Sequence, residues 1–424
     1  MITIVIVSLL ILFTLSVPIA FSLGIASTLA VNTADMPMLV VIQRMFGSLD
    51  LFPLMAIPFF ILAGNLMEAG GISKRLVNFA NTLVGSLSGG LAIVAVVTSM
   101  FFAAISGSGP ATTAAIGSIL IPAMIARGYD RNFAGGVQAV SGELGVIIPP
   151  SIPLILYGVT AEVSISKLFI AGVIPGFLIA GSLMLVVFLI SKKKGYKGEA
   201  KATTAERLEA FRKAFLALLM PVIILGGIYG GIFTPTEAAA VAVVYAFVIG
   251  CFVYRELKIK DLYKVFYNSA ITTAIIMIII STAGLFGWIL TRERVPQEIA
   301  SAFTSFTDSP IMFLILINLL LWVVGMFFET ASSIIILAPI LTPIAVAVGI
   351  DPVHFGIIMV VNLAMGMVTP PLGVNLFVAV QIANTTLEKI TKSLLPFLFI
   401  LIVDILIISY TPSLSMWLPS LIGK

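Results

Sequence analysis

Long apolar runs alternate with short polar connections along nearly the whole chain. The apolar blocks lie at residues 2–17, 18–40, 51–70, 89–126, 131–162, 167–190, 213–232, 235–254, 265–291, 310–349, 353–382 and 394–418. Many of them reach the roughly 20 residues that a helix needs to cross the hydrocarbon core of a bilayer. The pattern therefore predicts an all-α protein that crosses a membrane many times. Residues 2–40 are compatible with either one helix or two.

The composition supports this class and excludes several others. Hydrophobic residues make up 60% of the 424 residues and charged residues only 10%, too few to cover a soluble domain of this size. A single Cys excludes a disulfide framework, and a single His argues against a metal site built from His ligands. The net charge of +4 is modest and does not indicate a nucleic-acid surface.

Residues 191–212 form the only long polar stretch, and they are rich in Lys and Arg. Cytoplasmic loops of membrane proteins carry an excess of these two residues, so this stretch is predicted to be a cytoplasmic linker. Shorter basic stretches at 73–75, 126–131 and 254–264 are expected on the same side of the membrane.

The linker separates two halves, residues 1–190 and 213–424, that share landmarks at a nearly constant spacing. The double prolines Pro149-Pro150 and Pro370-Pro371 lie 221 positions apart (370 − 149 = 221), and the motifs ILIPA and ILTPI have the same offset. The shared residues are Pro and Gly rather than Leu, which argues against chance similarity between apolar segments. If each half crosses an odd number of times, the second is an inverted repeat of the first. Five crossings per half fit the charge pattern and place both termini outside.

Two apolar blocks are too long for one crossing and have small, polar centres. Residues 89–126 contain SGSGPATT, and residues 310–349 contain ETASS. Neither centre resembles an exposed loop, so we predict two re-entrant helical hairpins, a geometry tolerated only inside protein or against a water-filled cavity. The weakly amphipathic segments 72–88 and 296–309, each of which precedes a hairpin, are interpreted as interfacial arms.

Two other blocks contain a proline pair in the middle of an apolar run. Residues 131–162 contain GVIIPPSIP, and residues 353–382 contain GMVTPPLGV. Proline lacks an N–H group and clashes with the preceding turn, so each block is predicted to be a broken helix. A break leaves backbone groups without helical partners, at a cost of several kcal/mol each in lipid. Free carbonyls suit a small cation, and helix N-termini suit an anion.

The hairpin tips and helix breaks together predict two equivalent cation sites beside one central substrate cavity. Neither tips nor breaks contain Lys or Arg, so an anionic substrate would depend on bound cations, helix ends and hydroxyl groups. The predicted cation-binding residues are Ser106, Ser108, Gly109, Gly145, Ile148, Gly325, Thr330, Ser332, Gly366 and Thr369. The predicted substrate-binding residues are Ser108, Pro149, Pro150, Ser151, Ser333, Pro370, Pro371 and Asn375.

Three carboxylates inside apolar segments are further candidates, because such residues are often functional. Glu143 precedes the first break and could serve either a structural hydrogen bond or the transport site. Glu237 follows Thr-Pro at an expected helix start, where a carboxylate caps free N–H groups. Glu329 opens the second hairpin tip, where helix capping and cation binding are equally reasonable interpretations.

Four segments together resemble a known family. FFAAISGSGPATTAAIGSILIPAM, GVIIPPSIPLILYG, GGIFTPTEAAAVAV and GMVTPPLGVNLFV are similar to the large membrane subunit of tripartite ATP-independent periplasmic (TRAP) transporters, the DctM-like or SiaM-like subunit. The resemblance extends over essentially the full chain.

This resemblance implies import of an organic acid, such as sialic acid or a C4-dicarboxylate, across the bacterial inner membrane. It also implies at least two Na⁺ sites near the hairpin tips and an elevator motion of a transport core against a scaffold. The implied partners are a small four-helix membrane subunit and a periplasmic substrate-binding protein.

Three other interpretations explain less of the pattern. An intramembrane hydrolase would use Ser108 as nucleophile and His354 as base, but the serine is expected at a hairpin tip and the histidine near a membrane surface. A channel fits less well, because paired closed tips suit alternating access rather than a continuous pore. A stand-alone sodium–dicarboxylate carrier of the same superfamily would need no periplasmic partner.

Overall fold

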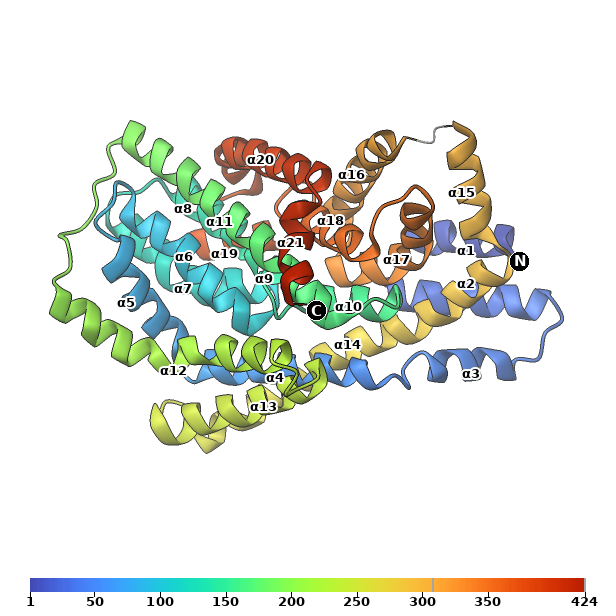
Figure 1. Cartoon of the computed structure of the whole chain (residues 1–424), viewed down its shortest axis with the longest axis horizontal. Coiled ribbons are helices and arrows are strands. Elements are labelled where there is room, and N and C mark those ends of the chain that lie inside the picture. The colour runs from blue at the N-terminus through green and yellow to red at the C-terminus, as the bar shows by residue number, and fades with distance from the viewer. Residues whose placement is uncertain (307–308, 423–424) are drawn as a thin grey trace.

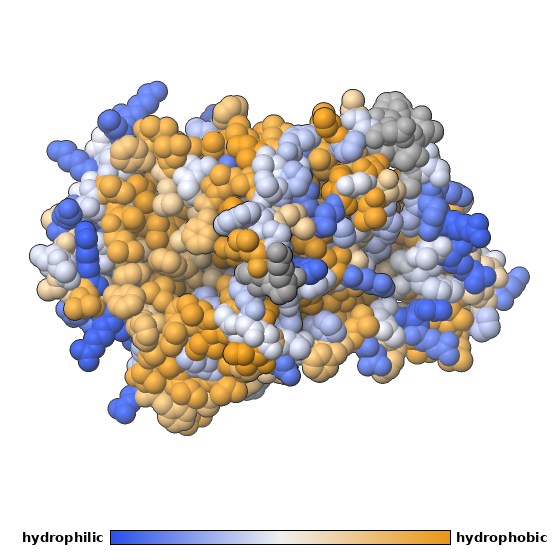
Figure 2. All heavy atoms as spheres, in the orientation of Figure 1, coloured by the Kyte–Doolittle hydropathy of each residue, from blue (hydrophilic) through white to orange (hydrophobic). Residues whose placement is uncertain are grey.

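The computed structural model describes residues 1–306 and 309–422, and these residues form helices with no β-strand (Figure 1). Nine of the described helices are long and apolar enough to cross a membrane, or ten spans if a bent helix pair is counted as one. Hydrophobic residues cover most of the middle of the visible face, and hydrophilic residues gather toward its left and right ends (Figure 2). The predicted all-α, multi-pass membrane class is confirmed.

Residues 2–40, which the sequence left open as one helix or two, form two helices and the start of a third. Pro18 caps the second helix, and the preceding turn contains Ser16 at φ +58°. The elements are α1 (Ile2–Thr14), α2 (Ile19–Thr33), α3 (Leu39–Gly47), the 3₁₀ helix η1 (Phe52–Met55), α4 (Ala56–Ala69), α5 (Ile72–Val84), α6 (Gly90–Ser106), α7 (Gly109–Ala126), α8 (Arg131–Gly142), α9 (Leu144–Ile147), α10 (Ile152–Thr160) and α11 (Ile165–Lys194).

The second half follows a similar order of elements. They are α12 (Thr204–Tyr229), α13 (Pro235–Val248), the π-helix η2 (Ile249–Val253), α14 (Ile259–Arg292), α15 (Val295–Phe306), α16 (Pro310–Phe327), α17 (Thr330–Ala347), α18 (Pro352–Gly366), α19 (Val374–Ala383), α20 (Leu387–Tyr410) and α21 (Ser413–Ile422). The predicted arms correspond to α5 and α15, except that residues 307 and 308 of the second arm lie outside the described residues.

Helix boundaries in the two halves recur at the offset seen in the sequence. Helices α7 and α17 both have 18 residues and begin 221 positions apart (330 − 109 = 221). Asp130 and Asp351, which share this offset, cap α8 and α18: the N–H of Phe133 donates to Asp130 at 2.9 Å, and that of Val353 to Asp351 at 2.7 Å. Equivalent residues therefore start equivalent helices, as expected for a structural repeat.

Each long apolar block with a polar centre folds as two helices joined by two residues. Gly107 and Ser108 join α6 to α7, and Phe328 and Glu329 join α16 to α17. Gly107 has φ +60°, a conformation that glycine adopts without the steric cost paid by other residues. The predicted helical hairpins are therefore present in the chain fold.

Both double-proline segments interrupt a helix. Helix α8–α9 ends before Pro149, and α10 continues after a bend of 41°. In the second half α18 ends at Gly366 and α19 begins at Val374. The Pro149-Pro150 and Pro370-Pro371 peptide bonds are both cis. Within the described residues, neither proline pair lies inside an uninterrupted helix, in agreement with the predicted breaks.

Helices outside the hairpins and broken helices pack beside them, α4 against α6 and α14 against α17. Helix α4 packs against α13 and α14, and α14 also packs against α2 and α3. Helices α3, α4, α13 and the left part of α14 lie along the lower part of Figure 1, whereas α8, α11, α16, α18 and α20 lie in its upper part. A cavity lies where α4 and α14 meet the hairpin tips.

Helices α11 and α12 extend into the polar stretch at residues 191–212 between the halves. Only residues 195–203 lack helical structure, and they are tied to neighbouring loops. Glu199 accepts a hydrogen bond from Asn81 at 2.8 Å and pairs with Arg127 at 2.8 Å, while its N–H donates to the Gly85 carbonyl.

Candidate transport cavity

A cavity of about 370 Å³ lies between the two hairpin tips, the helix breaks and helices α4 and α14. The first tip contributes Ser106 and Ser108, and the second contributes Glu329 and Ser332. Because the tips come from opposite halves of the chain, the repeat brings two equivalent segments to one space. The sequence predicted this arrangement of two tips beside a central cavity.

The first tip forms a compact group of oxygen atoms. The hydroxyls of Ser106 and Thr112 lie 2.8 Å apart, and Thr112 also donates to the Ser108 carbonyl at 2.8 Å. Gly145, from the first helix break, packs directly on this group: a Cβ placed there would lie 2.6 Å from Thr112 Oγ1. Glycine therefore lets the backbone of the broken helix approach the oxygen atoms.

The first break is bonded to the first tip. The N–H of Ile152, at the start of α10, donates to the Gly107 carbonyl at 3.3 Å. Ser151 caps α10, and its hydroxyl donates to the Val146 carbonyl at 2.5 Å. The N–H of Ile148 donates to the Leu144 carbonyl at 2.9 Å, which continues the helical bonding of α9. These bonds satisfy backbone groups that the break would otherwise leave unpaired.

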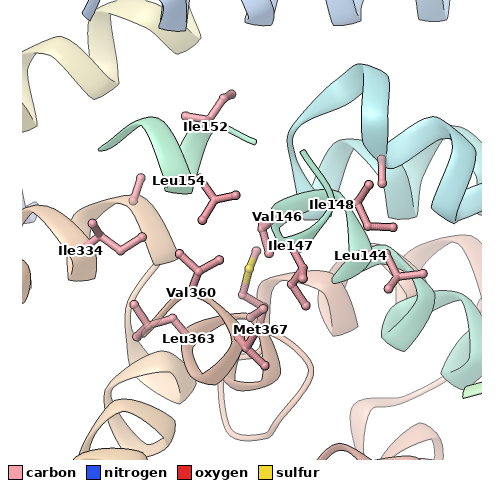
Figure 3. Close-up of a cluster of buried hydrophobic side chains, with 14 of the residues drawn as sticks. Leu144, Val146, Ile147, Ile148, Ile152, Leu154, Ile334, Val360, Leu363 and Met367 are labelled. Carbon is pink, nitrogen blue, oxygen red and sulfur yellow. The ribbon is translucent and has the colours of Figure 1, made fainter. Parts of the chain in front are cut away.

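Apolar side chains from both breaks form one buried cluster, and its members Val146 and Met367 also line the cavity (Figure 3). Val146 and Ile147 come from the first break, and Met367 comes from the second. Ile334 of the second hairpin lies in the same cluster. This packing fixes the two breaks relative to each other.

Glu329 caps α17, the second helix of the second hairpin. Its carboxylate accepts a hydrogen bond from the Ser332 N–H at 3.2 Å, and its carbonyl accepts one from the Ser333 hydroxyl at 3.0 Å. Thr330 is fully buried, and its hydroxyl has no hydrogen-bond partner within the described residues. Buried hydroxyl groups are usually hydrogen-bonded, so this unpaired oxygen beside an acidic residue stands out.

At the second break, Thr369 makes two hydrogen bonds through its hydroxyl. It donates to the Met365 carbonyl at 2.8 Å and accepts from the Trp322 indole at 3.2 Å. Gly366 lies so close to Gly325 of α16 that any added Cβ would collide with the Gly325 backbone. The two predicted glycines therefore form one close helix contact.

Several predicted substrate residues lie outside the cavity wall. Pro149 lines a separate apolar cavity of about 250 Å³ beside α12. The Asn375 amide packs against Gly109 of the first tip and donates to the Ala139 carbonyl at 3.4 Å. The other predicted substrate residues that do not line the cavity are Pro150, Ser151, Ser333, Pro370 and Pro371. Their assignment to substrate stays a prediction.

The remaining two carboxylates have different surroundings. Glu237 forms a capping box with Thr234, accepting from its N–H at 2.8 Å and from its hydroxyl at 2.9 Å, so the capping interpretation agrees with the geometry. Glu143 is buried with no hydrogen-bond partner for either carboxylate oxygen within the described residues. It lies near Asp404, which accepts a hydrogen bond from Ser182.

His354 is held by hydrogen bonds on both ring nitrogens. Nδ1 lies 2.6 Å from the Ser415 hydroxyl, and Nε2 lies 3.3 Å from the Ser409 carbonyl. The ring is buried and is not part of the cavity containing Ser108. A base that activates Ser108 would have to contact it, so the hydrolase interpretation has no structural support.

Sequence reasoning missed several residues of the cavity and its supports. Thr112 lies within the SGSGPATT centre already singled out, and its position six residues after Ser106 was not used. Asn65 and Glu68 of α4 also line the cavity. A polar pair four residues or fewer apart in an apolar helix was the available signal for them.

The charged residues among the described lining of the cavity are all acidic. Glu68 and Glu329 are its acidic residues, and none of the described residues that line it is Lys or Arg. This wall offers an anion no cationic side chain among its described residues, and its carboxylates disfavour an anion wherever they are ionised.

The fold and cavity define a membrane transporter, with a polar site where hairpin tips meet broken helices. A family model described as "Tripartite ATP-independent periplasmic transporter, DctM component" matches residues 6–414. The chain therefore belongs to this family. It is a multi-pass transporter permease of the bacterial inner membrane and not an enzyme.

Similar proteins carry related names. The chain is 50% identical over 403 residues to an isethionate TRAP transporter permease protein DctMQ of Oleidesulfovibrio alaskensis, covering 95% of this chain and 64% of that protein. It is 47% identical over 380 residues to the C4-dicarboxylate TRAP transporter large permease protein DctM of Pseudomonas aeruginosa, covering 90% and 89%. It is 40% identical over 405 residues to the sialic acid TRAP transporter large permease protein SiaM of Vibrio cholerae, covering 95% of each.

A solved structure shares the fold. The YdaH transporter of Alcanivorax borkumensis aligns with a TM-score of 0.61 at 16% sequence identity, covering 89% of this chain and 86% of that one. This likeness supports the architecture and says nothing about the substrate.

Proposed function

We propose that the chain imports an organic acid anion in a Na⁺-coupled reaction, as the large membrane subunit of a TRAP transporter. The observation that carries this proposal is the cavity between both hairpin tips, whose charged lining residues, Glu68 and Glu329, are acidic. The relatives are named for isethionate, C4-dicarboxylates and sialic acid, and each of these is an organic anion. Sialic acid and C4-dicarboxylates are thus the first substrates to test.

The first proposed Na⁺ site lies at the first tip. Its ligands would come from Ser106, Ser108, Gly109, Gly145 and Ile148. The oxygen group around Thr112 supports this assignment, because hydroxyl and carbonyl oxygens are suited to a hard cation.

The second proposed Na⁺ site lies at the second tip and break. Its ligands would come from Gly325, Thr330, Ser332, Gly366 and Thr369. The unpaired Thr330 hydroxyl and the acidic Glu329 beside it support this site. Bound cations would supply the positive potential that the wall lacks, so an anion would bind well only when Na⁺ is present.

The proposed transport motion moves the hairpins and broken helices against the remaining helices. Helices α4 and α14 line the cavity on one side and belong to the group along the lower part of Figure 1. A shift of the opposite group relative to them would carry the cavity across the membrane. The proposed partners are a small four-helix membrane subunit and a periplasmic substrate-binding protein.

Reconstituted uptake tests this function directly. Vesicles containing the chain and its small subunit are given labelled sialic acid or C4-dicarboxylate, with and without binding protein, in Na⁺ or K⁺ buffer. Uptake that needs both Na⁺ and binding protein is expected. Full uptake in K⁺ would overturn the coupling, and uptake of free acid without binding protein would favour a stand-alone carrier.

A further inference from the structure

A basic cavity of about 450 Å³ lies between the C-terminal end of α11 and the beginning of α20. Three lysines line it: Lys193 and Lys194 from α11, and Lys392 from α20. Phe133 and Pro396 form part of its apolar wall. The cavity shares no lining residue with the transport cavity, so the proposed transport reaction does not account for it.

The lysines are poorly neutralised by protein. Lys193 and Lys194 form no ion pair within the described residues, and Lys392 lies 3.6 Å from Glu388, whose side chain is 84% exposed. An exposed pair of this kind contributes little. The Lys194 ammonium lies 5.4 Å from the centre of the Phe133 ring, an additional contact that holds it over the apolar wall.

Helix capping explains only part of this cluster. Lys193 and Lys194 lie in the last turn of α11, where a cation is favoured by the helix dipole. Lys392 lies in the second turn of α20, near the helix end that favours an anion instead. The helix dipole therefore accounts for the two lysines of α11 but not for Lys392.

Apolar side chains continue from the cavity along the membrane-spanning parts of both helices. Ile190 lies one turn before Lys193 and Lys194 on α11. On α20, Pro396 and Phe399 follow Lys392 at spacings of four and seven residues, which places all three on one face. Phe399 is 69% exposed, and both helices are long and apolar enough to span a bilayer.

We propose that this cavity binds an anionic phospholipid, with the phosphate on the three lysines and an acyl chain along Pro396 and Phe399. A lysine ammonium binds phosphate as a point charge. Basic cavities between membrane helices on the cytoplasmic side suit the head groups of anionic lipids, and the basic end of α11 is predicted to lie on that side. A free phosphate would use the lysines but would leave the exposed apolar face without a partner.

The test compares two triple variants of the full chain, extracted from the membrane with any bound subunit in place. The first, K193Q/K194Q/K392Q, removes the three charges of the cavity. The matched control, K192Q/K197Q/K389Q, removes the same charge at nearby lysines that do not line the cavity. Native mass spectrometry measures retention of added phosphatidylglycerol, with phosphatidylcholine and inorganic phosphate as competing probes.

The cavity variant is expected to lose phosphatidylglycerol affinity by roughly fivefold per lysine, whereas the control retains it. The single variant K392Q changes one exposed lysine and should lower the phosphatidylglycerol affinity about fivefold. It replaces the triple variant in the test if the triple variant does not accumulate. Equal retention by the two triple variants would overturn the proposal. Displacement of the lipid by inorganic phosphate, or equal binding of phosphatidylcholine, would also overturn it.

Discussion

Ser108 and Glu329 occupy equivalent places in the two hairpins, 221 positions apart (329 − 108 = 221), and both line the same cavity. Each is the residue before the hairpin's second helix. Their chemistry differs, because Glu329 caps its helix through its carboxylate and Ser108 makes no side-chain capping bond. The repeat therefore builds two related sites of unequal charge.

This difference predicts separate effects for two substitutions of Glu329. In Glu329→Gln an amide oxygen can still accept from Ser332, so the fold should persist while the Na⁺ concentration for half-maximal uptake rises. In Glu329→Ala the cap is lost as well, which should cost about 1 kcal/mol of stability. Uptake titrated with Na⁺ and thermal melting of each variant separate the two effects. Unchanged Na⁺ dependence in Glu329→Gln would show that Glu329 caps the helix and does not take part in Na⁺ binding.

Loss of one hydroxyl ligand should weaken Na⁺ coupling at either site. Ser106→Ala and Thr369→Ala are each expected to raise the Na⁺ concentration for half-maximal uptake about fivefold, the effect of a contact worth about 1 kcal/mol. Ser118→Ala is the control, since this hydroxyl lies further along α7 and donates to the Ala115 carbonyl. If both site variants match the control in uptake titrations, the ligand assignments are wrong.

The sequence predicted the features that depend on backbone chemistry. Pro and Gly act locally, so the double prolines predicted both helix breaks, and the small polar centre SGSGPATT predicted the first hairpin tip. The constant offset of these landmarks located the repeat as well. Helix lengths were less accurate: the basic residues that suggested a linker partly belong to α11 and α12.

Contacts between distant segments could not be predicted from one sequence. Trp322 bonds to Thr369 across 47 positions, and the Asn375 amide from the second half packs on Gly109 in the first. Local pattern carries no signal for such pairs, because they depend on how whole helices pack. Pro149 likewise lines a separate cavity beside α12, a placement that its local sequence does not indicate, and its substrate role stays a prediction.

Gly145 should not tolerate a side chain. In Gly145→Ala the new methyl group would collide with the Ser108 carbonyl and lie 2.6 Å from the Thr112 hydroxyl, so the break must move away from the tip. Uptake at saturating Na⁺ should fall at least tenfold, a loss of about 1.4 kcal/mol or more. Gly226→Ala on α12 meets no atom within 4 Å and should leave uptake unchanged. Equal activity of both variants would argue against a close contact at Gly145.

The capping box at α13 predicts a variant that lowers stability without altering coupling. Glu237→Ala removes the acceptor for the N–H and hydroxyl of Thr234. The melting temperature should fall, while the Na⁺ dependence of uptake stays at the wild-type value because Glu237 does not line the cavity. Glu237→Gln, which keeps an acceptor, should recover part of the stability. A shift in Na⁺ dependence for either variant would place Glu237 in the transport reaction.

Glu199 should hold the segment between the two halves against neighbouring loops. Its carboxylate contacts Asn81 of α5 and Arg127 at the end of α7, and its N–H bonds to Gly85. Glu199→Ala removes both side-chain contacts, so amide hydrogen exchange in residues 195–203 should accelerate by roughly fivefold, as expected for a lost hydrogen bond of about 1 kcal/mol. Glu209→Ala is the control, because its exposed pair with Lys213 lies within α12. Exchange that is equally slow in both variants would show that backbone bonds alone order this segment.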